Sequence, residues 1–442
     1  MAPSEKVQPV GMRAFTIVWI GQMVSMMGTG MTRFAITIWA WQITGEATAL
    51  ALVAFFSFGP MVILSPIAGA LVDRWNRKLV MMLSDLAAGL STIIILALFV
   101  TDNLQIWHLY AAGAFAGAFE AFQFPAYSAA VSTMVSKDQY TRVHSMIGLG
   151  EPTSQIAAPI LAGALLVAIG LTGILIIDIV TFLVAIGTLL AVHIPEPDRS
   201  DAGREGQGNL WQESLYGFRY IFERPSLLGL QLLFLGGNLT SSMAFVLYPA
   251  LILARTSNNE LILATVQSAL GIGGVVGGVV LAAWGGPKRR IHTLLGAWFM
   301  NGVGTMAMGF SQQIAFWSIA HFGIGFCIPF INGSNQAIWQ SKVPPDIQGR
   351  VFATRRLIAQ ISFPVSMLIV GPLADRVFEP AMVSGGRLVP LFGPFVGIGA
   401  GAGMGLMFVL SGLIIMLVGL SGYTINVIRN VEDILPDHDE VT

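Results

Sequence analysis

The feature that most constrains this chain is its series of continuous apolar runs, each about 20 residues long, the length at which an α-helix spans a bilayer. Only 11% of the 442 residues are charged and the mean hydropathy is +0.73, whereas a soluble protein carries about a quarter charged residues. Inside lipid the backbone must satisfy its own hydrogen bonds, which leaves helices or closed barrels. Barrel strands show as short alternating segments, so the continuous runs predict an all-α membrane protein.

The apolar runs divide into two sets of six. The predicted transmembrane helices cover residues 13–40, 48–72, 79–100, 106–134, 143–168, 172–193, 226–254, 261–284, 292–310, 313–340, 351–371 and 398–420. The longest polar stretch, PEPDRSDAGREGQGNLWQES, separates the sixth run from the seventh. We therefore expect an N-terminal six-helix bundle in residues 1–194, a cytoplasmic linker in 195–225, and a C-terminal six-helix bundle with a cytoplasmic tail in 226–442.

The basic residues orient this arrangement. Of the 23 Lys and Arg residues, 19 fall before the first span or in the gaps on the same side of the membrane, leaving Arg33, Arg255, Arg376 and Arg387 elsewhere. Positive charge stays in the cytoplasm, which predicts a multi-pass protein of the cell membrane with both termini cytoplasmic. The net charge of −1 gives no basis for a nucleic-acid partner.

The two halves also repeat. Val135, Asp138, Arg142 and Val143 follow the fourth span, and Val343, Asp346, Arg350 and Val351 follow the tenth at the same spacing, 208 positions later. Internal repeats of this kind are typical of transporters in which one bundle rocks against the other. The repeat supports two pseudo-symmetric bundles.

The linker carries apolar side chains at helical spacing among charged ones. They are Leu210, Trp211, Leu215, Phe218, Ile221 and Phe222. This pattern predicts an amphipathic helix, which lies either in the cytoplasmic membrane interface or as a short cytosolic helix packed on the loops.

Four spans carry polar stripes on an otherwise apolar surface. The stripe residues are Gln22, Thr29 and Arg33 on the first span, Glu120, Gln123 and Tyr127 on the fourth, Asn238 and Phe245 on the seventh, and His321, Asn332, Asn335 and Gln336 on the tenth. Such stripes cannot face lipid cheaply, so they face a water-filled cavity or make polar contacts between packed helices. We interpret them as a substrate cavity, with helix contacts as the alternative.

Two charges, Arg33 and Glu120, lie inside spans, where an unpaired charge is costly. A carboxyl group in a low-dielectric cavity takes up a proton more readily than one in water, so Glu120 is our first candidate for proton coupling. The rival interpretation is that Glu120 binds a cationic part of the substrate. Glu151 and Asp178 are further coupling candidates, although Asp178 also suits a structural hydrogen-bonding role. Asp85 is expected to pair with the basic cluster at Arg74–Lys78.

That basic cluster belongs to a motif between the second and third spans. The residues Gly69-Ala-Leu-Val-Asp73-Arg74-Trp-Asn-Arg77-Lys78 match all five defined positions of G-x-x-x-D-R-x-x-R-K. This motif resembles the signature of the major facilitator superfamily, and the resemblance covers the full chain. The segments DIVTFLVAIGTLL (178–190) and GPLADRVFEPAM (371–382) are similar to its drug:proton antiporter branch, which includes macrolide-efflux and enterobactin-exporter proteins.

The resemblance implies the major facilitator fold, with the first, fourth, seventh and tenth helices around a central cavity. It implies that Gly69, Asp73, Arg74, Arg77 and Lys78 form a conformational latch, in which Asp73 caps the eleventh helix near Gly349–Arg355. The expected function is secondary active export of small amphipathic molecules, such as a drug, a siderophore or a related metabolite, by alternating access with proton antiport. Protons and membrane lipids are its other partners, and the protein is expected to be a monomer.

Alternative functions on the same fold are a lipid or metabolite facilitator or flippase. A membrane-embedded enzyme is less favoured, because the chain has no G-x-x-x-x-G-K-[ST], H-E-x-x-H or G-x-S-x-G motif. We expect no cofactor and no metal, with the proton gradient as the energy source.

Overall fold

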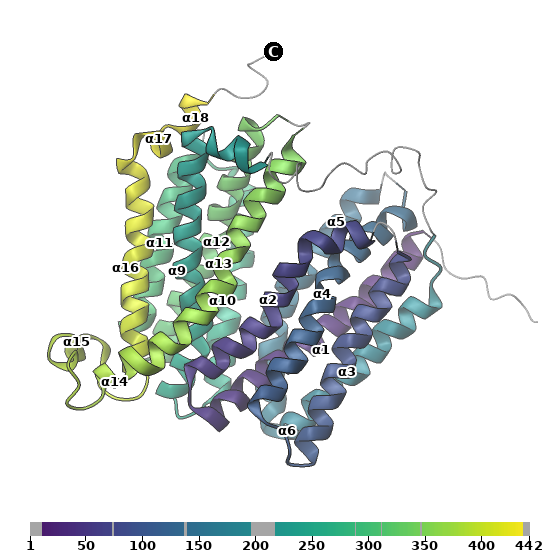
Figure 1. The fold of residues 1–442 in the computed structure, drawn as a ribbon, viewed down its shortest axis with the longest axis horizontal. Helices are drawn as coiled ribbons and strands as arrows, with labels where there is room; N and C mark the ends of the chain where they lie inside the picture. Colours follow the sequence, from purple (N-terminus) through teal and green to yellow (C-terminus); the bar gives the residue numbers. More distant parts are fainter. Residues whose placement is uncertain are drawn as a thin grey trace, which may run out of the picture. The chain divides into compact units, whose positions relative to one another are not determined.

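The computed structural model describes residues 11–72, 75–136, 139–195, 217–287, 289–310, 312–344 and 347–435. The described part is built from α-helices with one π-helical turn (Figure 1). In the first half these are α1 (Met12–Thr44), α2 (Ala47–Val72), α3 (Arg77–Val100), α4 (Ile106–Met134), α5 (Tyr140–Gly148) and α6 (Gly150–Ala191). In the second half they are α9 (Pro225–Arg255), α10 (Glu260–Trp284), α11 (Arg290–Phe310), α12 (Ile314–Lys342), α13 (Gln348–Leu373), the π-helical turn Ala374–Phe378, α14 (Glu379–Met382), α15 (Val389–Val396), α16 (Ala402–Thr424), α17 (Asn426–Arg429) and α18 (Val431–Ile434).

These helices confirm the twelve predicted spans. Nine of the described helices are long and apolar enough to cross a membrane. One of them contains α6, which is broken at Gly170 by a φ of +65° and so supplies two spans. The remaining two spans are α4 and α11.

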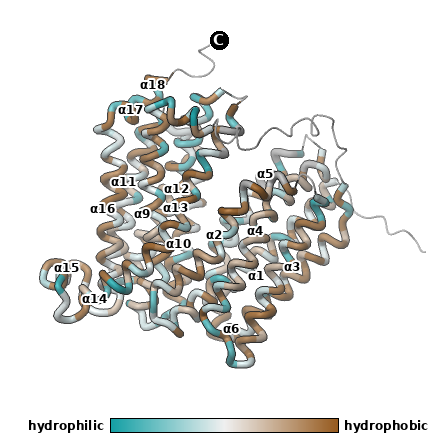
Figure 2. Tube along the Cα trace, in the orientation of Figure 1, coloured by the Kyte–Doolittle hydropathy of each residue, from teal (hydrophilic) through white to brown (hydrophobic). Residues whose placement is uncertain are grey.

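The outward faces of the helices are apolar. Ile63 and Ile319 are each 71% exposed, and Val167 is 68% exposed. Figure 2 shows hydrophobic residues running along the helices. Helices that are apolar on the outside as well as the inside are typical of a membrane span.

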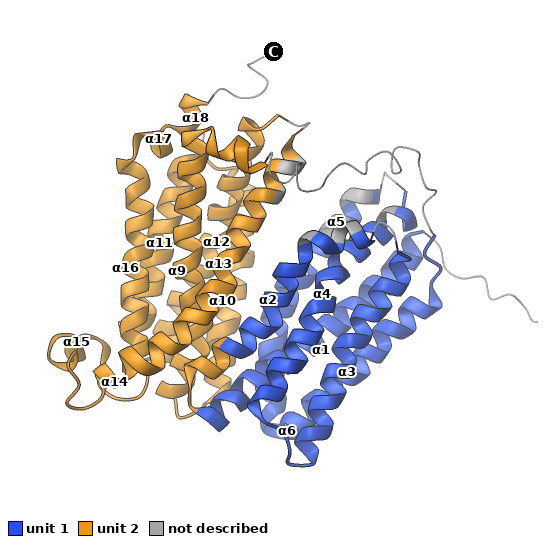
Figure 3. Ribbon diagram, viewed as in Figure 1, with its two compact units in different colours: residues 1–44, 52–198 blue, residues 45–51, 199–442 orange. Residues whose placement is uncertain are grey.

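The described residues cluster into two compact units, coloured separately in Figure 3. Unit 1 comprises residues 1–44 and 52–198, and unit 2 comprises residues 45–51 and 199–442. The first turn of α2 therefore belongs to unit 2, while the rest of that helix belongs to unit 1. Most of the predicted linker lies outside the described residues, and residues 217–222, at its end, are helical.

In unit 1, α1 packs along α6, and α3 packs against both α4 and α6. In unit 2, α11 packs against α12 and α16, α10 packs against α12, and α9 packs against α13 and α16. The α10–α12 contact depends on glycine, because a Cβ on Gly273 would lie 2.1 Å from the Phe322 carbonyl oxygen and one on Gly277 would lie 2.3 Å from that of Phe326. Small residues allow such close backbone approach.

The same hydrogen bond occurs in both units. Arg77, the first residue of α3, donates through Nη1 to the Ala129 carbonyl at 2.7 Å, and Arg290, the first residue of α11, donates through Nη1 to the Ala337 carbonyl at 3.3 Å. The two acceptors are 208 positions apart, the spacing of the sequence repeat. The repeat therefore extends from sequence to a matching side-chain contact in each bundle.

Candidate functional site

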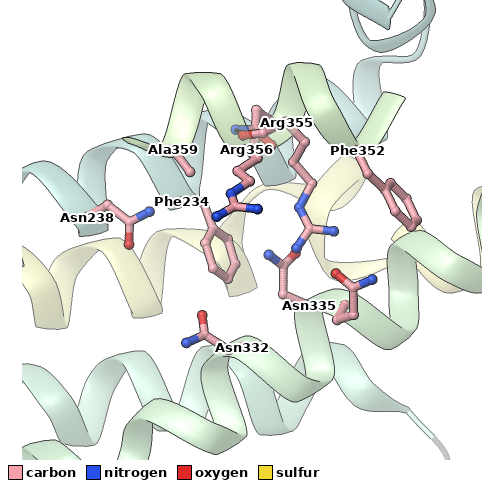
Figure 4. Close-up of a pocket in the computed structure, with 10 residues that line it drawn as sticks. Phe234, Asn238, Asn332, Asn335, Phe352, Arg355, Arg356 and Ala359 are labelled. Atoms are coloured by element: carbon pink, nitrogen blue, oxygen red, sulfur yellow. Dashed lines mark hydrogen bonds between the residues drawn. The ribbon is translucent and has the colours of Figure 1, made fainter. Parts of the chain in front are cut away.

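The candidate substrate site in unit 2 is a cavity of about 330 Å³ between α9, α12 and α13 (Figure 4). Its lining residues are Gln231, Phe234, Asn238, Asn332, Asn335, Gln336, Phe352, Arg355, Arg356 and Ala359. The volume lies near the lower end of the range for small-molecule sites. Four of the predicted cavity residues, Asn238, Asn332, Asn335 and Gln336, thus line one pocket.

Helix periodicity explains why these four side chains meet. Asn332, Asn335 and Gln336 are three or four residues apart on α12, so they share one face of that helix. Asn238 and Phe234 both come from α9, and Figure 4 shows them with Asn332 of α12 in the pocket. The pocket therefore combines amide groups with an aromatic wall.

Two arginines of α13 also reach this pocket, although no stripe on that span predicted them. Figure 4 shows the Arg355 and Arg356 side chains directed from α13 towards the asparagines of α12. The Arg355 guanidinium carbon lies 5.4 Å from the Trp339 ring centre and 5.6 Å from that of Phe352. The sequence does not predict this position, because Arg355 and Arg356 count among the 19 basic residues expected on the cytoplasmic side.

In unit 1, Asp85 lies at the centre of a buried polar network. Its Oδ2 accepts a 2.8 Å hydrogen bond from Gln22 Nε2, and its Oδ1 accepts a 2.9 Å bond from Gln123 Nε2. Gln123 Nε2 also lies 2.9 Å from Gln22 Oε1. Asp85 was expected to pair with the basic cluster, but the structure gives it two glutamine partners instead, from α1 and α4.

Asp178 on α6 occupies a second buried position in unit 1. Thr92 of α3 donates to its Oδ2 at 2.9 Å, and Thr29 of α1 donates to its Oδ1 at 3.3 Å. Only 4% of Asp178 is exposed. These contacts join three helices through one carboxyl group, the structural role considered for Asp178.

Arg33 and Glu120 form a loose pair within unit 1. Arg33 Nη2 lies 3.9 Å from Glu120 Oε1, and their side chains are 66% and 52% exposed. Because charged groups cannot face lipid cheaply, we expect charges this exposed within spans to face an aqueous space. Of the predicted coupling candidates, Glu120 is thus the carboxylate that combines a cation neighbour with open access.

The other predicted residues lie apart from these groups. Glu151 is exposed at the start of α6 and accepts a 3.2 Å hydrogen bond from Gln155. Tyr127 is half-buried, and its hydroxyl has no hydrogen-bond partner among the described residues. His321 is 4% exposed, and its Nδ1 lies 2.8 Å from the Val266 carbonyl, so Nδ1 carries the proton. Phe245 contacts the rings of Tyr248 and Phe363.

The structure describes three of the five residues predicted to form the latch. Asp73 and Arg74 lie outside the described residues, and Gly69 lies in the last turns of α2. Arg77 binds the Ala129 carbonyl, and Lys78 Nζ donates at 2.8 Å to the carbonyl of Val192, which ends α6. Cations near helix C-termini satisfy the last carbonyl groups, so Lys78 holds the end of α6, whereas Arg77 binds a carbonyl inside the last turns of α4.

A second capping site lies beyond α13. Asp375, in the π-helical turn, accepts hydrogen bonds from the backbone N–H groups of Ala47 and Thr48, at 3.0 and 2.7 Å, inside unit 2. Its spacing from Gly371 and Arg376 repeats the G-x-x-x-D-R spacing of Gly69, Asp73 and Arg74. That second copy is the sequence signal that would have found it.

Comparisons with known proteins agree with these features. The family model of the Major Facilitator Superfamily matches residues 18–367. Macrolide efflux protein A of Streptococcus pyogenes is 26% identical over 370 residues, covering 82% of this chain and 90% of that protein. The multidrug efflux pump Tap of Mycolicibacterium fortuitum is 26% identical over 362 residues (79% and 86% covered), and the enterobactin exporter EntS of Salmonella typhimurium is 26% identical over 242 residues (54% and 56%).

Solved structures share the fold. A bacterial homolog of the human lysosomal transporter Spinster, in an inward-facing and unoccupied conformation, aligns with a TM-score of 0.69 at 14% identity, covering 92% of this chain and 96% of that one. A bacterial homologue of the iron transporter ferroportin aligns with a TM-score of 0.62 at 14% identity, covering 92% and 97%. These relatives and fold neighbours are transporters and not enzymes. The chain belongs to the major facilitator superfamily and is a multi-pass membrane transporter with efflux pumps among its relatives.

Proposed function

We propose that the protein exports small amphipathic molecules, such as drugs, siderophores or related metabolites, by alternating access in exchange for inward-moving protons. It acts as a monomer in the cell membrane, with both termini cytoplasmic, and needs no cofactor. Its relatives' names give macrolides, multiple drugs and enterobactin as exported compounds. The observation that carries the coupling part is the accessible pair of Arg33 and Glu120 inside the spans of unit 1.

The chemistry of that pair suits proton exchange. At 3.9 Å the ion pair is too long for a strong hydrogen bond, so no tight contact fixes Glu120 to Arg33. Protonation neutralises Glu120 and so ends its pairing with Arg33, whose guanidinium stays charged and must then find water or another anion. A cationic substrate group would compete with the proton for the same carboxylate.

Asp85 and Asp178 differ from Glu120 in their surroundings. Each is buried and held by two side-chain donors, from Gln22 and Gln123 in one case and from Thr29 and Thr92 in the other. Proton exchange at either would require a path through packed helices. They are therefore the second choices for coupling, and Glu151, exposed at the start of α6, is the third.

Alternating access also needs contacts that hold one state and break in another. The latch residues Gly69, Asp73, Arg74, Arg77 and Lys78 have this role by resemblance. α2 is suited to it because its first turn belongs to unit 2 and its remainder to unit 1. Asp375 holds that first turn through two hydrogen bonds. A conformational change that moves the first turn of α2 away from Asp375 must therefore break both of them.

Transport into liposomes tests this function. Purified protein is reconstituted in vesicles with an acidic interior, and uptake of a radiolabelled macrolide or of enterobactin is followed after dilution into neutral buffer. We expect accumulation that a protonophore abolishes and that vesicles without protein lack. Protein-dependent uptake that only equilibrates, with or without the pH gradient, would establish facilitation instead and end the antiport proposal.

A further inference from the structure

The unit 2 pocket is lined by the half-buried Arg355, one of whose nitrogens is buried without a hydrogen-bond partner among the described residues. Arg355 Nη1 is fully covered and has no hydrogen-bond partner among the described residues. The rings of Trp339 and Phe352 lie near its guanidinium. A guanidinium has five N–H donors and is always charged in proteins, so this side chain has unused capacity for an anion.

The rest of the lining has the same polarity. Arg356 supplies a second positive charge, and none of the described residues that line the pocket is acidic. Asn335 is 4% exposed, and its Oδ1 also has no partner among the described residues. Among the described residues, the pocket lining therefore offers positive charge and one unmet acceptor without a carboxylate.

We propose that this pocket binds the carboxylate of an amphipathic substrate, which rests on the exporter function proposed above and names its substrate class. The planar fork of Arg355 matches a carboxylate in a two-point contact, and Arg356 adds long-range attraction. Phe234 and Phe352 form apolar walls for the part of the molecule next to the carboxylate. A hydroxyl or amide N–H on the same molecule would satisfy Asn335 Oδ1.

A matched set of probes tests the charge requirement. Protein in phosphatidylcholine nanodiscs is titrated by calorimetry with 2-naphthylacetate, its methyl ester and 2-(2-naphthyl)ethylamine, which share one apolar body. We expect the carboxylate to bind at least about 10-fold more tightly than the other two, the ratio that one charge-assisted hydrogen bond provides. Equal affinities, a preference for the amine, or no carboxylate binding would overturn the proposal.

Substitutions then locate the site. Arg355→Gln should weaken carboxylate binding by about 10-fold or more and leave the ester unchanged. Arg355→Lys should recover only part of the loss, because a lysine lacks the planar fork. Arg387→Gln removes an equal charge from an exposed position of unit 2 outside the pocket and should change nothing. If Arg355→Gln does not fold, Arg356→Gln, on the exposed arginine, takes its place.

Two further readouts are needed. One distinguishes a lipid phosphate from a substrate carboxylate as the bound group, and the other separates the carboxylate site from the exporter function. If phosphatidylglycerol in the nanodiscs competes with the carboxylate probe, the site belongs to a lipid phosphate and the substrate assignment falls. Loss of carboxylate selectivity with intact gradient-driven uptake would remove this inference and leave the exporter function standing. Selective carboxylate binding without any gradient-driven uptake would keep the carboxylate site and remove the exporter function.

Discussion

Asp375 accepts a 2.7 Å hydrogen bond from the backbone N–H of Thr48, so a carboxylate at the end of one helix caps the start of another. One turn later Glu379 does the same for α16, through the N–H groups of Gly401 and Met404, at 3.1 and 2.8 Å. The first N–H groups of a helix lack internal partners and attract negative charge. The π-helical turn and the first residue of α14 thus present two carboxylates that fix the starts of two helices within unit 2.

Removing one carboxylate should loosen one helix start. Asp375→Ala leaves the N–H groups of Ala47 and Thr48 without their acceptor, a loss of about 1 kcal/mol. Hydrogen–deuterium exchange should become faster in residues 47–51 and stay unchanged at the start of α16. Glu379→Ala is the matched control and should show the opposite pattern, whereas identical exchange in both variants would contradict separate caps.

The arginine–carbonyl hydrogen bond that both units share should contribute more to stability in unit 1 than in unit 2. Arg77 is half-buried and binds Ala129 at 2.7 Å, while Arg290 is exposed and binds Ala337 at 3.3 Å. We expect Arg77→Gln to cost about 1–2 kcal/mol and Arg290→Gln less, because solvent screens the exposed contact. Thermal unfolding followed by tryptophan fluorescence measures both, with exposed Arg142→Gln as the control. A larger loss for Arg290→Gln would show that burial does not set the strength of this contact.

Neighbouring glycines on α10 should respond differently to an added methyl group. A Cβ at Gly277 would lie 2.3 Å from the Phe326 carbonyl oxygen, whereas one at Gly278 has Pro329 Cγ as its nearest neighbour, at 4.0 Å. Gly277→Ala should therefore destabilise by about 1–3 kcal/mol, and Gly278→Ala should be tolerated. The yield and melting temperature of monodisperse protein in detergent give the comparison. Equal tolerance of the two changes would mean that α10 and α12 are not packed backbone to backbone.

The Asp85 network should tolerate loss of charge poorly. In Asp85→Asn one of the two acceptor oxygens becomes an NH₂ group, so either Gln22 or Gln123 loses its acceptor. A buried donor without a partner costs about 1–3 kcal/mol. We expect a lower melting temperature that falls further in Asp85→Leu, where both amides lose their acceptor. A melting temperature that is unchanged in both variants would show that the network adds nothing to folding.

Most of the fold could be predicted from the sequence, because a lipid environment allows few kinds of backbone structure. Apolar runs of membrane-spanning length had to become helices, and the break between the fifth and sixth spans fell at Gly170, where the chain adopts a positive φ. Helical spacing likewise placed Asn332, Asn335 and Gln336 on one face of α12, and all three line the pocket. In these cases a local rule determines the three-dimensional outcome.

Other parts of the site depend on which helices become neighbours. The sequence places Arg355 and Arg356 among the basic residues of the cytoplasmic side. Only the packing of α13 against α9 brings them to the pocket. Asp85 was expected near the basic cluster because that cluster is close in sequence, whereas its partners come from α1 and α4. Such pairings follow from tertiary packing, which spacing along one helix does not encode.

The most direct test of the account is proton movement through Glu120. Protein in liposomes that contain a pH-sensitive dye receives a macrolide or enterobactin, and wild type is compared with Glu120→Gln and with Glu223→Gln, an exposed carboxylate paired with Arg219. We predict substrate-dependent proton flux in wild type and Glu223→Gln and its loss in Glu120→Gln, with substrate binding retained. Flux that persists in Glu120→Gln would contradict the assignment of Glu120 and move the coupling role to Asp85, Asp178 or Glu151.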